Sequence, residues 1–233
     1  MSTLSDAHRF RKLVAGLCMI AAPALFLASS IVSPKLDTDE GTLLSNAAGH
    51  IDRWYVSAAL AFAGMVLLLP AVLGLMHMLR ERGTVYGNVG GGLALIGVMA
   101  GAANAGLTFV VWQMARAGDR AQMTALLHRI DHTAGTSIPL MFLGIALAVG
   151  VIVLAWGLAR AHAAPTWCTL CLALAAVAFA IAAPAASQPL FIVASALLMA
   201  GLAPIGRMVM TETEQEWEHT PEVTGFFPAL GAH

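Results

Sequence analysis

The chain has 233 residues, of which 59% are hydrophobic and 11% are charged, and its formal net charge at pH 7 is −1. Soluble domains carry about 25% charged residues, so this composition excludes an ordinary water-soluble domain and predicts an all-α membrane protein. The balanced charge gives no basis for nucleic-acid binding, and the expected partner is the lipid bilayer.

Six apolar runs follow in chain order, each of about 18 residues or more, as a transmembrane helix requires. They are about 13–32, 54–79, 89–114, 137–159, 166–183 and 189–208. A single helix over 166–208 would be about 65 Å long against a hydrocarbon core of about 30 Å, and Pro184 and Pro189 favour a turn there. The predicted domains are a cytoplasmic N-terminus (1–12), a six-helix transmembrane domain (13–208) and an acidic cytoplasmic tail (209–233).

Lysine and arginine residues in the connections predict the orientation. With the N-terminus inside, seven basic residues lie on the cytoplasmic side: Arg9, Arg11, Lys12, Arg80, Arg82, Arg160 and Arg207. Five lie outside: Lys35, Arg53, Arg116, Arg120 and Arg129. This favours a cell-membrane protein with both termini cytoplasmic. A cleaved signal peptide over 1–32 is the alternative, but its apolar run exceeds the usual 7–15 residues.

Short sequence matches indicate an internal repeat. The segments 16–21, 92–97 and 171–176 resemble one another, and Ile51-Asp52 matches Ile130-Asp131. The expected layout is therefore three tandem helical hairpins, each made of two consecutive spans.

Two long outer connections each contain an amphipathic stretch. The apolar positions are Leu43, Leu44, Ala47, Ala48 and Ile51 in the first, and Met123, Leu126, Leu127 and Ile130 in the second. Both stretches are predicted to be interfacial helices on the outer leaflet.

The second connection carries HRIDHT, in which His128 and His132 would share one helix face. Two imidazoles at this spacing can bind Zn²⁺, and Asp131, His50 or Asp52 could complete the site if the hairpins pack together. An open zinc position would acidify water for hydrolysis. The spacing resembles that of membrane ceramidase-like hydrolases, a resemblance limited to the two histidines. A haem between His50 and His132 is a further alternative, and a polar membrane edge without a ligand is the favoured interpretation.

Other motifs predict packing. Gly97, Gly101, Asn104 and Thr108 form a stripe that suits helix packing or a ligand contact. The Trp167–Cys171 segment resembles a redox CxxC motif, but it lies on the reducing side of the membrane, which favours structural cysteines. The spans lack deep charged residues, which disfavours ion-coupled transport.

The overall layout resembles that of uncharacterised six-span actinobacterial membrane proteins over about residues 10–210. The shared features are a basic start, Ser33-Pro34, long outer loops, and LPAVLGL at 69–75 before a short basic turn. This resemblance implies no activity. The sequence favours a non-enzymatic protein that binds a lipid, a small hydrophobic ligand or a partner subunit, with a homo-oligomer left open. The alternative is a metal- or haem-dependent enzyme with a His/Asp site at the outer face.

Overall fold

The computed structural model describes residues 2–212, except for the side chains of 2–8, 136, 140 and 143, and this part of the chain is all-helical. Its helices are α1 (Ser2–Val32), α2 (Glu40–Gly49), α3 (Ile51–Met78), α4 (Thr84–Arg116), α5 (Arg120–His132), α6 (Ala134–Arg160), α7 (Thr166–Ala182) and α8 (Gln188–Thr211). The all-α prediction is therefore confirmed. Most of the predicted acidic tail lies outside the described residues.

Five of these helices are long and apolar enough to cross a membrane: α1, α3, α4, α6 and α8. The remaining predicted span, 166–183, corresponds to α7, which has 17 residues. At 1.5 Å per residue α7 is about 25 Å long, slightly less than the core thickness of about 30 Å. Length and composition thus support a membrane protein with five spanning helices.

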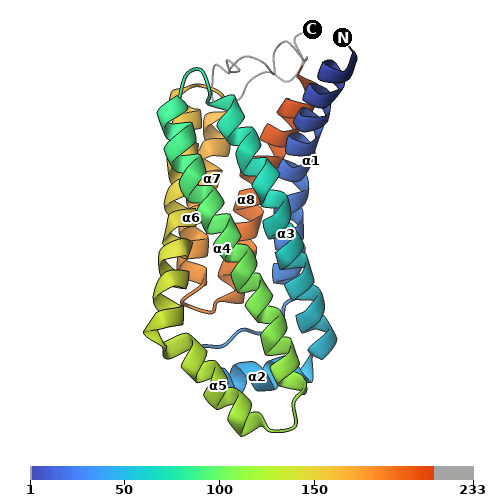
Figure 1. Cartoon of the computed structure of the whole chain (residues 1–233), viewed down its shortest axis with the longest axis vertical. Coiled ribbons are helices and arrows are strands. Elements are labelled where there is room, and N and C mark those ends of the chain that lie inside the picture. Colours follow the sequence, from blue (N-terminus) through green and yellow to red (C-terminus); the bar gives the residue numbers. More distant parts are fainter. Residues whose placement is uncertain (1, 213–233) are drawn as a thin grey trace.

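Six helices form a closed ring that follows the chain order. Each of α1, α3, α4, α6 and α7 contacts the next of the six, and α8 returns to contact α1 (Figure 1). The short helices α2 and α5 lie across one end of this bundle, whereas α1 begins and α8 ends at the opposite end (Figure 1). We call the pair α2 and α5 the cap.

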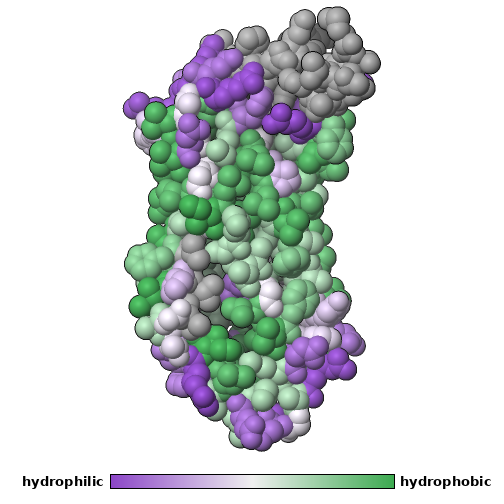
Figure 2. Space-filling view, viewed as in Figure 1, coloured by the Kyte–Doolittle hydropathy of each residue, from purple (hydrophilic) through white to green (hydrophobic). Residues whose placement is uncertain are grey.

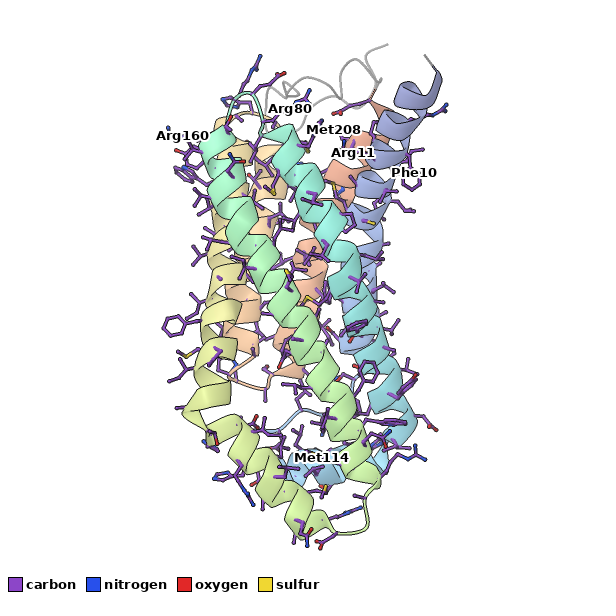
Figure 3. The ribbon with its side chains drawn as sticks, in the orientation of Figure 1. Phe10, Arg11, Arg80, Met114, Arg160 and Met208 are labelled. Carbon is purple, nitrogen blue, oxygen red and sulfur yellow. The ribbon has the colours of Figure 1, made fainter. Side chains whose placement is uncertain are left out.

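The surface of the bundle is divided into zones along its long axis. On the face shown in Figure 2, hydrophobic residues form a belt across the middle, and hydrophilic residues collect at both ends. Arg11, Arg80 and Arg160 lie at the end opposite the cap, and Met114 lies beside the cap (Figure 3). A belt of this kind is the surface expected of a helix bundle surrounded by lipid.

Glycine allows α4 and α6 to approach closely. A Cβ added to Gly150 of α6 would meet the carbonyl oxygen of Gly90 at 2.7 Å and the Cα of Ala94 at 2.8 Å. Both atoms belong to the α4 backbone, which cannot move aside as a flexible side chain can. Small residues at such crossings are a common means of packing helices in membranes.

Serine hydroxyls join α1 to its two neighbours in the ring. Ser29 Oγ donates to the Ser57 carbonyl of α3 at 2.9 Å, and Ser30 Oγ lies 3.1 Å from Ser195 Oγ of α8. The Gln188 side chain also donates to the carbonyls of Ser30 and Ser33. Hydrogen bonds between helices satisfy polar groups that lipid cannot solvate, so they fix which faces of these helices meet.

The cap has a small core of its own. Helix α4 is about 50 Å long and extends beyond the bilayer thickness, so Met114 near its end packs with Leu44 of α2 and Leu127 of α5. Of the residues on the predicted apolar faces, Leu44 and Leu127 are buried in this core, whereas Leu126 is 40% exposed. Each cap helix starts at an aspartate whose carboxylate accepts a backbone N–H, as an N-cap does.

Candidate functional site

The cap brings together one carboxylate and two imidazoles. Glu40 opens α2, and His128 and His132 lie one turn apart near the end of α5. The same Glu40 oxygen, Oε1, lies 3.1 Å from His128 Nδ1 and 3.2 Å from His132 Nε2. One ligand atom from each residue lies within 4.8 Å of the other two. Among the described residues, this is the group whose geometry could hold a metal ion.

The surroundings favour the anionic form of Glu40. The pKa of this carboxyl is lowered, first because its own backbone N–H hydrogen-bonds it and then because His128 does so. Its place in the first turn of α2 acts in the same direction, because the positive end of the helix dipole stabilises negative charge there. The Glu40 side chain is 18% exposed, whereas those of His128 and His132 are 61% and 63% exposed. A charged carboxylate thus faces two imidazoles that water can reach.

The other predicted site residues occupy separate positions. His50 joins α2 to α3, and its Nδ1 lies 3.3 Å from the carbonyl oxygen of Asn46. Asp52 lies in the first turn of α3 and is exposed. Neither belongs to the group around Glu40. The haem alternative would need the imidazoles of His50 and His132 to bind the same iron. In this structure they have different neighbours, because His132 contacts Glu40 and His50 contacts the Asn46 carbonyl of α2.

Asp131 adjoins the histidines but faces a different feature. It lines a cavity of about 280 Å³ beneath the cap, together with Asp37, Trp54, Asn104 and Thr108 among other residues. Partial desolvation raises the pKa of Asp131, and the nearby charge of Glu40 adds to the rise. Asp131 therefore lines the smaller cavity and is not one of the candidate ligands grouped around Glu40.

The predicted stripe on α4 divides between packing and this smaller cavity. Gly97 packs against Leu147 of α6 and Gly101 against Met65 of α3. Asn104 and Thr108 line the smaller cavity, and the Thr108 carbonyl accepts the Trp54 indole N–H at 3.1 Å. The two glycines thus lie at helix contacts, and the two polar residues lie where a ligand could contact them.

A larger, apolar cavity of about 610 Å³ opens in the bundle wall. Helix α6 contributes the largest share of its lining, and α1, α3, α7, α8 and Pro184 of the α7–α8 connection supply the rest. Every described residue on its wall is apolar or glycine; Phe26, Met65, Ile145, Ala180 and Leu198 are examples. The cavity therefore offers an apolar ligand contact surface without a charge to desolvate.

The cysteine motif lies away from both cavities. Cys168 is buried, Cys171 is partly buried, and both are free, as is Cys18. Cys168 packs in the main core of the bundle, which is the position expected of a structural cysteine.

Sequence reasoning missed Glu40 and the larger cavity. Glu40 directly follows an aspartate that caps α2, and the predicted amphipathic stretches lay on the same side of the membrane. If the two amphipathic stretches had been predicted to pack against each other, Glu40 of the first would have been expected opposite His128 and His132 of the second. The cavity leaves no comparable signal, because its residues resemble ordinary lipid-facing ones. Comparison with family models, curated proteins and solved structures gives no match to this chain.

Proposed function

We propose that this chain is a multi-pass integral membrane protein that binds a lipid acyl chain in the larger cavity. The proposal is carried by one observation, a cavity of about 610 Å³ whose described lining is wholly apolar. Ligand pockets in proteins typically measure about 300–1,000 Å³, so this cavity is large enough for a ligand.

The mouth of the cavity points to the class of ligand. Met141, Ile145 and Val149 line the cavity and are also 57%, 49% and 43% exposed, so they border both its interior and the outside of the bundle. All three lie within the stretch of α6 that is long and apolar enough to cross a membrane, Ser137–Arg160, where the surroundings would be hydrocarbon. An acyl chain of the bilayer can therefore enter sideways without passing through water. A shorter hydrophobic molecule or a helix of a second copy would meet the same surface.

The same proposal includes α7 as a sixth span and three hairpins, α1 with α3, α4 with α6, and α7 with α8. One stripe of α7 supports it: Leu170, Leu174, Val177 and Ile181 are 45–55% exposed and repeat at helical spacing. An exposed apolar stripe on a bundle helix is stable when lipid covers it. The deficit of α7 against the core thickness is small, and bilayers accommodate such mismatches at modest cost.

Aromatic residues support the position of the bilayer. Tyr55 and Trp112 contact each other near the cap end, with ring centroids 5.0 Å apart. Trp156 lies near the other end, beneath the Arg160 guanidinium. Tryptophan and tyrosine gather at membrane interfaces, so the cap helices would lie at the outer interface, just beyond Trp112.

The orientation can be tested by cysteine labelling, and we expect the cap to face outward. In a chain without native cysteines, Ala121→Cys on exposed α5 should react with a membrane-impermeant maleimide in intact cells. Thr84→Cys, at the opposite end, should react only after the membrane is permeabilised. The basic residues near α1, α3 and α6 predict this result through the positive-inside rule. The reverse labelling pattern would invert the proposed topology.

Filling the cavity should displace its ligand. Gly144 lines the cavity, and an added Cβ there meets no atom within 4 Å. A Gly144→Phe side chain can therefore grow into the space that the acyl chain would occupy. We expect photocrosslinking by a diazirine-labelled fatty acid to α6 and α7 to fall about tenfold, equivalent to about 1.4 kcal/mol of affinity. Native mass spectrometry should show the matching loss of co-purified lipid.

The control for this experiment is Gly106→Phe. Gly106 lies on α4, away from the cavity lining, and an added Cβ there also meets no atom within 4 Å. The substitution is the same, so general effects on helix stability and detergent binding should be similar. Equal crosslinking in Gly144→Phe, Gly106→Phe and the unsubstituted protein would refute the cavity as the lipid site.

A further inference from the structure

We propose that Glu40, His128 and His132 form a site for Zn²⁺ or a related divalent transition metal, which fastens α2 to α5. Glu40 is 88 residues from His128 and 92 residues from His132 in the sequence, so the packing of α2 against α5 is what brings the carboxylate to the two imidazoles. This metal site is independent of the acyl-chain cavity, which lies elsewhere in the bundle.

The separation of the ligand atoms suits a tetrahedral ion. Zinc binds histidine nitrogen and carboxylate oxygen at about 2.0–2.2 Å, which places two ligands of a tetrahedron about 3.3–3.6 Å apart. Glu40 Oε1 lies 3.1 and 3.2 Å from the two imidazole nitrogens, so each of these two pairs is within a few tenths of an ångström of the tetrahedral spacing. One ligand atom from each of the three residues lies within 4.8 Å of the other two.

The donor set selects the class of metal. Two imidazoles and one carboxylate suit zinc, cobalt, nickel or copper, whereas calcium and magnesium require oxygen ligands. Both imidazoles are largely exposed, so water can occupy the fourth position. Three protein ligands with one open position are also the arrangement of catalytic zinc sites, including sites with two histidines and one glutamate.

Metal binding would act on the cap as a clasp. Between α2 and α5 the packing rests on a core of three buried residues, Leu44, Met114 and Leu127. In a closed cap α2 packs against α5, and in an open cap the two helices are apart. An ion that binds only the closed cap lowers its free energy by an amount that grows with the logarithm of the ion concentration divided by Kd. The clasp would therefore hold the cap over the smaller cavity, which Leu127 and Asp131 line.

The test uses full-length protein in lipid nanodiscs, purified with a tag that contains no histidine. Zn²⁺ is titrated in competition with a chromophoric indicator, and Co²⁺ is used to record the visible spectrum of a tetrahedral site. We expect one ion per chain with micromolar affinity. Glu40→Gln keeps the shape and one hydrogen-bond acceptor but removes the anionic ligand, and the combined His128→Ala/His132→Ala variant removes both imidazoles. Each should weaken binding about a hundredfold or more, because too few ligands remain.

Matched controls are His50→Ala and Asp52→Asn, because these residues also lie at the cap end but outside the ligand group. Both should bind Zn²⁺ as the unsubstituted protein does. Monodisperse elution of every variant in the presence of a chelator shows that the fold is intact. His132→Cys keeps a zinc ligand at this position, so it should retain most of the affinity of the unsubstituted protein for Zn²⁺. Lack of saturable binding by the unsubstituted protein, or binding unchanged in Glu40→Gln and in the double variant, would overturn the proposal.

Discussion

Replacement of Gly150 by leucine is expected to lower the thermal midpoint of the protein by about 10 °C. Overpacking a core typically costs about 1–3 kcal/mol, and the upper end applies here because the new Cβ would meet the α4 backbone. For a chain of this size, about 3 kcal/mol corresponds to a shift of roughly 6–12 °C. The midpoint can be measured in detergent by the fluorescence of a thiol-reactive dye or by loss of monodisperse protein after heating.

The control for Gly150→Leu lies on α4, away from the cavity lining. Gly106→Leu introduces the same side chain where an added Cβ meets no atom within 4 Å, so its midpoint should stay unchanged or rise slightly. A rise is expected because leucine is a better helix former than glycine by roughly 0.8 kcal/mol. Equal midpoints for Gly106→Leu and Gly150→Leu would contradict the close approach of α4 and α6.

Replacement of Leu127 by aspartate is expected to open the cap while the bundle stays folded. Leu127 is 5% exposed in a small core whose other buried residues are Leu44 and Met114, so the change removes a large part of the apolar contact and buries a carboxyl group. Loss of a buried leucine costs about 3 kcal/mol, which corresponds to about a hundredfold faster amide exchange in α2 and α5. Exchange in the interior of α1 and α8 should not change.

Leu126→Asp serves as the partner variant, because Leu126 is the preceding residue and is 40% exposed. It adds the same charge to the same helix without entering the cap core. Exchange in α2 and α5 should remain close to that of the unsubstituted protein. If the two aspartate variants opened the cap equally, or if Leu127→Asp also exposed α1 and α8, the cap would not be a separate unit.

Composition and periodicity were sufficient to predict the helical elements. Each apolar run became a helix, because a long apolar stretch has few ways to satisfy its backbone groups in lipid other than as a helix. The boundaries shifted where polar residues continue a helix beyond its apolar part, as at α1, which begins at Ser2 rather than near residue 13. The length of α7 is the main difference, since it falls short of the five long helices.

The candidate site was harder to predict, because it depends on contacts between distant segments. The HRIDHT spacing places His128 and His132 on one face of a helix, and that expectation follows from helical geometry alone. The third member of the group depends on how α2 packs against α5, which no local pattern specifies. His50 and Asp52 had a stronger local resemblance to the motif, yet Glu40 lies against the histidines.

Closure of the ring by α8 has a consequence for biosynthesis. The end of α1 and the start of α8 are separated by about 155 residues, so at roughly 5–20 residues per second the ribosome needs about 10–30 s to make α8 after α1. During that interval the face of α1 that carries Ser30 is already synthesised, and its partners Gln188 and Ser195 do not yet exist. The Ser30 hydroxyl can meanwhile keep its hydrogen bond to the Phe26 carbonyl of α1, whereas the carbonyls of Ser30 and Ser33 gain the Gln188 donor only when the last helix is made.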